Sequence, residues 1–223
     1  RGTARLANAL VALGVEPGDR VAVQVEKSPE AILLYLACLR AGAVYLPLNT
    51  AYTPGELEYF IGDAQPRVVV CSPEKRDAIA GIAARLGVSA TETLGGDGIS
   101  GTMVARAAAA DSQFQTAIRE ADDLAAILYT SGTTGRSKGA MLTHGNLSSN
   151  ALALKHCWRF TADDVLLHAL PIYHTHGLFV ATNVVLLAGA EMIFLPKFDV
   201  ETIVKHLSEA TTMMGVPTYY TRL

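Results

Sequence analysis

Residues 130–139 combine side chains and backbone that are suited to binding a chain of phosphate groups. They read Thr-Ser-Gly-Thr-Thr-Gly-Arg-Ser-Lys-Gly and follow an apolar stretch, residues 124–129, which predicts a buried strand. A glycine-rich turn after a strand exposes consecutive backbone N–H groups, and these form a concave site for an anion. The hydroxyl groups add hydrogen-bond donors, and Lys138 adds a movable positive charge. The run therefore predicts binding of a nucleotide polyphosphate.

The spacing of the glycines differs from that in the P-loop of nucleotide hydrolases. The P-loop has four residues between its glycines and a lysine directly after the second one. Here two threonines separate Gly132 from Gly135, and two further residues stand between Gly135 and Lys138. A P-loop hydrolase is therefore disfavoured. A flexible Ser/Thr/Gly-rich linker is disfavoured too, because neither the apolar strand nor the lysine fits a linker composition.

The composition favours a compact globular protein and disfavours several kinds of partner. Half of the 223 residues are hydrophobic and 17% are charged. The net charge of −3, without a basic stripe, argues against nucleic acid as a partner. The longest strictly apolar run, residues 31–39, is too short for a membrane span, which needs about 20 residues. The three cysteines are far apart and form no CxxC pair, so we expect them in the core of a protein in the reducing cytoplasm.

Apolar periodicity predicts helices that alternate with short strands along the chain. Helices are expected at 5–13, 29–40, 54–63, 73–86, 105–110, 143–156, 177–187 and 200–210, the last capped by Asp199. Strands are expected at 21–25, 43–47, 67–71, 124–129, 165–170, 191–195 and 211–215. Residues 91–101, rich in Gly, Thr and Asp, predict an exposed connection. The pattern predicts one α/β unit with parallel-rich sheets flanked by helices.

Three polar segments follow the predicted carboxyl ends of strands: 130–139, 171–176 and 216–222. Ligands of parallel α/β sheets bind at this edge. We therefore expect the three segments to line a single cleft. An ordinary hairpin at residues 130–139 would argue against nucleotide binding there.

The sequence Tyr-Thr-Ser-Gly-Thr-Thr-Gly-Arg-Ser-Lys-Gly, residues 129–139, resembles the phosphate-binding signature of the adenylate-forming enzymes. These comprise acyl- and aryl-CoA synthetases, luciferases and nonribosomal peptide adenylation domains. The resemblance extends over essentially the whole chain, through residues 14–22, 39–49, 170–177 and 213–218. Within this superfamily, residues 169–183 and 194–199 look most like malonyl-CoA synthetases.

The resemblance implies a two-step reaction with ATP, Mg²⁺ and coenzyme A. A small carboxylic acid attacks the α-phosphorus of Mg-ATP, giving an acyl adenylate and pyrophosphate, and the thiol of coenzyme A then displaces AMP. Because two anions must meet, fixed dipoles and cations have to offset their repulsion. The resemblance assigns nucleotide binding to Thr130, Ser131, Gly132, Thr133, Thr134, Gly135, Arg136, Ser137 and Lys138.

The resemblance also implies residues that handle the acid. His174 occupies the family's motif position beside the substrate carboxylate, and it joins Thr130 and Lys138 as a catalytic candidate. His176 and Gly215 are candidates for substrate binding, although His176 is equally consistent with a surface histidine. The two histidines stand two positions apart with no cysteine or carboxylate nearby, which is a poor set of metal ligands. No resident metal site is therefore predicted.

Arg222 bears on the class of substrate. It follows an apolar and aromatic segment, residues 216–220, and a guanidinium beside such a wall needs an anionic partner. We hypothesise that Arg222 binds the distal carboxylate of a dicarboxylic acid such as malonate or methylmalonate. The alternative is an ordinary arginine on a helix surface.

The resemblance further implies that residues 1–223 are a truncated N-terminal AMP-binding domain, inactive by itself. The family's Tyr-Gly-x-Thr-Glu segment, which contacts adenine and Mg²⁺, does not occur in the sequence, nor does a C-terminal domain with a catalytic lysine. Two alternatives to a dicarboxylate ligase stay open. One is a fatty-, acetyl- or aryl-CoA ligase or an adenylation module of a peptide synthetase. The other is a nucleotide-binding domain without ligase activity.

Overall fold

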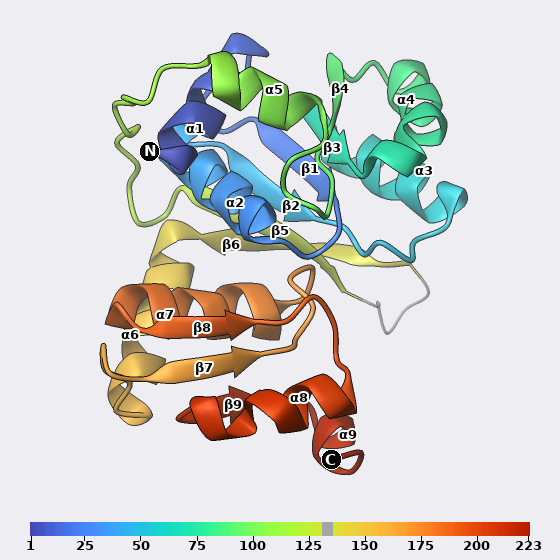
Figure 1. Ribbon diagram of the computed structural model, residues 1–223. Coiled ribbons are helices and arrows are strands. Elements are labelled where there is room, and N and C mark those ends of the chain that lie inside the picture. Colours follow the sequence, from blue (N-terminus) through green and yellow to red (C-terminus); the bar gives the residue numbers. More distant parts are fainter. Residues whose placement is uncertain (131–135) are drawn as a thin grey trace. The chain divides into compact units, whose positions relative to one another are not determined.

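The computed structural model describes residues 1–130 and 136–223 (Figure 1). The chain divides into two compact units, Arg1–His144 and Gly145–Leu223, which we call unit 1 and unit 2. The sequence pattern predicted one α/β unit, whereas the residue contacts form two.

Unit 1 contains a six-stranded sheet of the order β4-β3-β1-β2-β5-β6. Its strands are β1 (Arg20–Gln24), β2 (Val44–Pro47), β3 (Val68–Cys71), β4 (Ala90–Thr93), β5 (Leu124–Thr130) and β6 (Lys138–Thr143). Neighbouring strands from β4 to β5 are parallel, which confirms the predicted parallel-rich α/β fold. Among the described strands of this sheet, only β5 and β6 pair in the antiparallel direction.

Helices flank this sheet in two groups (Figure 1). The helices are α1 (Gly2–Ala12), α2 (Pro29–Ala41), α3 (Pro54–Ala64), α4 (Arg76–Arg85) and α5 (Thr102–Ala109). Helix α1 packs against α2 and α5, whereas α3 packs against α4. A capping box starts α3, because the Thr53 side chain accepts a hydrogen bond from the backbone of Glu56 and the Glu56 side chain accepts one from the backbone of Thr53.

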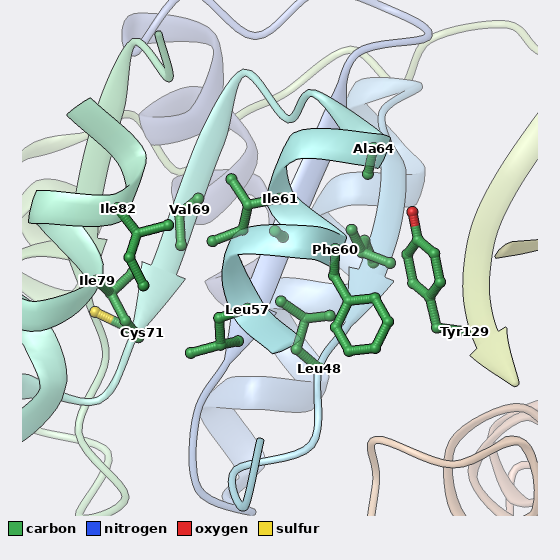
Figure 2. Packing of buried hydrophobic residues seen from close by; sticks show 12 residues of the cluster. Leu48, Leu57, Phe60, Ile61, Ala64, Val69, Cys71, Ile79, Ile82 and Tyr129 are labelled. Atoms are coloured by element: carbon green, nitrogen blue, oxygen red, sulfur yellow. The ribbon is translucent and has the colours of Figure 1, made fainter. Parts of the chain in front are cut away.

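The core between the sheet and the pair α3 and α4 is shown in Figure 2. Leu57, Phe60 and Ile61 of α3 are each less than 5% exposed. They pack, together with Ile79 and Ile82 of α4, against side chains of the sheet. Burying one such aliphatic or aromatic side chain contributes about 1.5–3 kcal/mol. Helix α3 is therefore firmly anchored beside β5, whose Tyr129 belongs to the same cluster.

Two strands of unit 1 correct the prediction from sequence. Strand β4 lies in the segment that we expected to be an exposed connection. Its Ala-Thr-Glu-Thr sequence has no apolar alternation, and it becomes a strand because it pairs with the buried strand β3. Strand β6 lies where we expected the chain to lead straight into a helix. Three of its six residues are exposed and none is fully buried, so it lacks the apolar pattern of a buried strand.

Unit 2 contains a parallel sheet of the order β8-β7-β9. Its strands are β7 (Val165–His168), β8 (Glu191–Phe194) and β9 (Thr212–Met214). Its helices are α6 (His144–Cys157, which starts at the last residue of unit 1), α7 (Asn183–Ala188), α8 (Val200–His206) and α9 (Pro217–Tyr220). The predicted cap of α8 is confirmed, since the Asp199 side chain accepts a hydrogen bond from the backbone of Thr202.

Two segments of unit 2 differ from the prediction. The helix expected at 177–187 consists of a π-helix, His176–Thr182, followed by α7. The segment 216–222, expected as a loop, contains the short helix α9, because Pro217 is well suited to a first helical position. In the part of the chain that the structure describes, no helix has the length and apolar character required to cross a membrane.

Candidate functional site

The strands β5 and β6 bring the described members of the phosphate-binding run together. Thr130, the last residue of β5, is paired in register with Lys138, the first residue of β6. The side chains of Thr130, Arg136 and Lys138 are exposed, and Ser137 is half-buried. Of the other predicted members, Ser131, Gly132, Thr133, Thr134 and Gly135 lie outside the described residues.

The pairing of β5 with β6 bears on the expectation that an ordinary hairpin would argue against nucleotide binding. The two strands pair in the antiparallel direction, and their described register ends at Thr130 and Lys138. Residues 131–135, which come between the two strands in the sequence, lie outside the described residues. The hairpin criterion therefore stays untested, and nucleotide binding at this run stays a prediction.

Helix α3 contacts both sides of the antiparallel pair of β5 and β6, which we call the β5–β6 stem. The sequence analysis did not predict these contacts. Tyr129, at the end of β5, donates its hydroxyl to Oδ2 of Asp63 at 2.5 Å. Burial raises the pKa of the Tyr129 hydroxyl, and the hydrogen bond to Asp63 raises it further. On the β6 side, Tyr59 donates its hydroxyl to the carbonyl of Ser137 at 2.8 Å. The only signal in the sequence is that positions 59 and 63 share one face of a helix.

In unit 2, the structure places two of the predicted substrate-binding residues on one pocket. His176 and Gly215 both line a cavity of about 510 Å³, together with apolar side chains that include Phe160 and Met214. His174 is exposed, and its ring packs edge-on against Tyr173 with a centroid distance of 4.7 Å. Partial burial lowers the pKa of His174 and of His176 below the usual value of 6.5. Both imidazoles are therefore neutral at pH 7.

The segment that carries the two histidines is held by side chains that sequence reasoning missed. His168, at the end of β7, is fully buried, and its Nε2 lies 2.8 Å from the carbonyl oxygen of Gly177. Because a carbonyl only accepts, this nitrogen carries the proton. Thr182 donates its hydroxyl to the same oxygen at 2.8 Å. A Cβ added at Gly177 would lie 2.1 Å from the carbonyl oxygen of Pro171, so only glycine fits there.

Arg222 takes a different position from His176 and Gly215. Its guanidinium lies 5.4 Å from the centre of the Phe198 ring, and that ring packs against Tyr219 at a centroid distance of 3.9 Å. Arg222 is exposed and is not among the described residues that line the pocket with His176 and Gly215. Among the described residues, none of the ion pairs uses Arg222. Its guanidinium edge is thus available to a carboxylate.

The candidates form two groups, one in each unit. Thr130, Arg136, Ser137 and Lys138 belong to unit 1, and His174, His176, Gly215 and Arg222 belong to unit 2. A single cleft lined by both groups stays a prediction. Among the described residues, no three His, Cys, Asp or Glu side chains are grouped closely enough to hold a metal ion.

Comparisons with known proteins agree with the sequence signature. The family model of the AMP-binding enzymes matches residues 1–223. A feruloyl-CoA synthase of an Amycolatopsis species is 36% identical over 99% of this chain and 43% of its own length. A mitochondrial malonate–CoA ligase of Mus musculus is 33% identical over 92% of this chain and 35% of its own length.

A solved structure matches the fold over its whole extent. The crystal structure of ATP-bound MatB from Rhodopseudomonas palustris is 65% identical, covers all of this chain and 44% of that one, and gives a TM-score of 0.96. The chain thus spans less than half the length of these proteins. The match of the family model over the full sequence confirms the resemblance. The chain belongs to the family of AMP-binding enzymes.

Proposed function

We propose that this chain forms part of an AMP-forming acid–CoA ligase that activates a short dicarboxylate, malonate or methylmalonate. The observation that carries the proposal is the 65% identity, over the full chain, to a protein solved with ATP bound. The malonate–CoA ligase among the relatives supports the choice of acid. The proposed reaction joins the acid to AMP, releases pyrophosphate, and transfers the acyl group to the thiol of coenzyme A.

In this proposal, the end of the β5–β6 stem binds the β- and γ-phosphates of ATP. Lys138 contributes an exposed ammonium group, and Thr130, opposite to it in register, contributes a hydroxyl donor. Arg136 adds a second cation on the same segment. Charges held in place before the reaction offset the repulsion between the carboxylate and the phosphates, and they orient pyrophosphate as the leaving group.

The acid is assigned to unit 2. His174 is neutral at pH 7 because partial burial lowers its pKa. A neutral imidazole can donate a hydrogen bond to the reacting carboxylate without neutralising it as a nucleophile. Arg222, whose guanidinium lies over the Phe198 ring, donates its N–H groups to the distal carboxylate of a dicarboxylic acid in this proposal. Coenzyme A acts as the second substrate.

Mg²⁺ would enter the site together with ATP, because this ion is usually held by substrate phosphates and waters with only one or two carboxylates. Among the described residues, no three His, Cys, Asp or Glu side chains form a group that could hold a metal ion by themselves. The charge stabilisation that this chain supplies comes from Lys138 and Arg136, and from the hydroxyl of Thr130.

An aryl acid is the second candidate substrate, because a feruloyl-CoA synthase is 36% identical over nearly the whole chain. The two candidates differ in what they need beside the reacting carboxylate. A dicarboxylate needs a cation such as Arg222, whereas a feruloyl group needs an apolar and aromatic wall. The stack of Arg222 on Phe198 supplies a cation at an aromatic surface, and it favours the dicarboxylate.

The test is a panel of acids in an ATP–pyrophosphate exchange assay, carried out on a ligase of full family length that contains this chain. We expect exchange with malonate or methylmalonate to exceed exchange with acetate, propionate or ferulate. The variant Arg222→Ala should lower exchange with malonate and leave exchange with acetate unchanged. An equal loss for all acids would remove Arg222 from substrate selection, and no exchange with any acid would contradict the ligase assignment.

A further inference from the structure

The segment Arg136–Lys138, which we call the exit arm, is contacted by one residue of α3 in two ways. The hydroxyl of Tyr59 donates a hydrogen bond of 2.8 Å to the carbonyl oxygen of Ser137. The guanidinium of Arg136 lies over the face of the Tyr59 ring, 5.6 Å from its centre. The first contact restrains the backbone directly before Lys138. The second restrains the neighbouring cation.

Tyr59 itself is rigidly held. Its helix begins at the capping box of Thr53 and buries Leu57, Phe60 and Ile61 in the core of unit 1. Its ring also packs against Phe60 at 5.4 Å and against Tyr129 at 6.3 Å between centroids. Figure 2 shows Phe60 and Tyr129 side by side at the edge of this core. The packing of α3 and of the Tyr59 ring therefore fixes the position of the Tyr59 hydroxyl beside the exit arm.

The other side of the stem is fixed by the same helix. Asp63, one turn after Tyr59, accepts the hydrogen bond from Tyr129 at the end of β5. The residues Tyr59 and Asp63 lie on one face of α3, as positions four apart do. One helix face thus restrains both the strand that ends at Thr130 and the arm that leads to Lys138.

We propose that Tyr59 is a positioning residue for the nucleotide, acting through Ser137 and Arg136 on the exit arm. The inference deepens the proposed function and rests on it. Binding a flexible, charged segment to a phosphate costs conformational entropy, and ordering that segment beforehand reduces this cost. Tyr59 orders the exit arm through one hydrogen bond and one cation–π contact. It touches neither the acid nor the reacting atoms in this account, so it should affect ATP and not the acid.

The test is the variant Tyr59→Phe in a ligase of full family length that contains this chain. It removes the hydrogen bond to Ser137 and keeps the ring beneath Arg136. We expect the KM for ATP to rise about three- to tenfold, as for the loss of one hydrogen bond, while the KM for the acid stays unchanged. The variant Tyr59→Leu also removes the ring, so its KM for ATP should rise further. Tyr45→Phe, which removes a buried tyrosine hydroxyl from β2 of unit 1, is the matched control and should leave the KM for ATP unchanged.

The outcomes separate this inference from the proposed function. A KM for ATP unchanged in both Tyr59 variants would overturn the positioning role. Parallel rises in the KM for ATP and for the acid, with a matching fall in thermal stability, would also overturn it and leave Tyr59 a residue of the core. If the unmodified ligase exchanged no pyrophosphate with any acid, the proposed function would fail. In that case, calorimetric binding of ATP to the unmodified protein and to Tyr59→Phe would still test Tyr59.

Discussion

The two groups of candidate residues are held in place by different kinds of contact. In unit 1, the supports come from far along the chain, since Tyr59 and Ser137 are 78 positions apart and Asp63 and Tyr129 are 66 apart. In unit 2, Gly177 is held by His168, nine positions before it, and by Thr182, five positions after it. The first kind of support consists of tyrosine hydroxyl hydrogen bonds that link α3 to residues near the ends of β5 and β6. The second is a close backbone approach at the start of the π-helix His176–Thr182.

This difference implies that the two sites respond differently to substitution. Removing a hydroxyl that restrains an exposed arm should change ligand affinity and leave the fold intact. Disturbing the turn at Gly177 should damage unit 2 itself.

The largest effect is expected for Gly177→Ala. The added Cβ would lie 2.1 Å from the carbonyl oxygen of Pro171, so the turn has to shift, at a cost of about 3 kcal/mol of unfolding free energy. Unfolding by urea, followed by circular dichroism, measures this cost. Gly55→Ala, whose added Cβ would meet no atom within 4 Å, is the control and should leave stability unchanged or slightly raise it. Equal stability of the Gly177 variant and the unmodified protein would show that the turn is not rigid.

The next effect is expected for Lys138→Ala. Without its ammonium group, the end of the stem loses its charge next to the triphosphate, and pyrophosphate exchange should fall by about ten- to a hundredfold. The fold should not change, since this side chain is exposed. Lys205→Ala, an exposed lysine of α8, is the control and should retain full exchange. Full exchange in the Lys138 variant would show that nucleotide binding does not depend on the end of the β5–β6 stem.

A smaller effect is expected for Thr182→Val. The variant keeps the shape of the side chain and removes its hydrogen bond to the carbonyl of Gly177, for a loss of about 1 kcal/mol of unfolding free energy. The KM for the acid should rise, because the segment that carries His174 and His176 leads directly into Gly177, while the KM for ATP should not. This pattern is the reverse of that expected for Tyr59→Phe. A raised KM for ATP with an unchanged KM for the acid would contradict the assignment of the acid to unit 2.

The smallest effect concerns pH. Burial lowers the pKa of His174 below its usual value of 6.5, so the imidazole takes up a proton at a lower pH than a histidine in the unfolded chain. The folded protein thus binds this proton less readily than the unfolded chain, and any linked stability is present above the unfolded pKa and is lost as the pH falls. The kcat/KM for the acid should decline on the acidic side with a midpoint below pH 6.5. A midpoint above pH 6.5 would argue against a lowered pKa of His174.

The sequence predicted the parts of the fold that depend on local patterns. The start of α3 at Pro54, the cap at Asp199 and the buried strands β1 and β3 all follow from neighbouring residues. Strands β4 and β6 were missed because each becomes a strand through its pairing partner, and their own side chains lack an apolar alternation. The phosphate-binding run was recognisable because its glycines, hydroxyls and lysine are consecutive.

The supports of the candidate sites could not be predicted in the same way. Nothing near Ser137 in the sequence points to Tyr59, because the hydrogen bond between them exists only once α3 has packed beside β5. His168 looked like one residue of a strand, and its role depends on the turn that brings Gly177 back to it. Arg222 was proposed from its aromatic neighbours in sequence. Its actual stacking partner, Phe198, lies before α8.

A crystal structure of a full-length ligase containing this chain, with ATP bound, tests the central claim most directly. The account predicts that β- or γ-phosphate oxygens lie within hydrogen-bonding distance of Nζ of Lys138 and of the hydroxyl of Thr130, at the end of the β5–β6 stem. A triphosphate bound away from this stem, with Lys138 and Thr130 facing solvent, would contradict it.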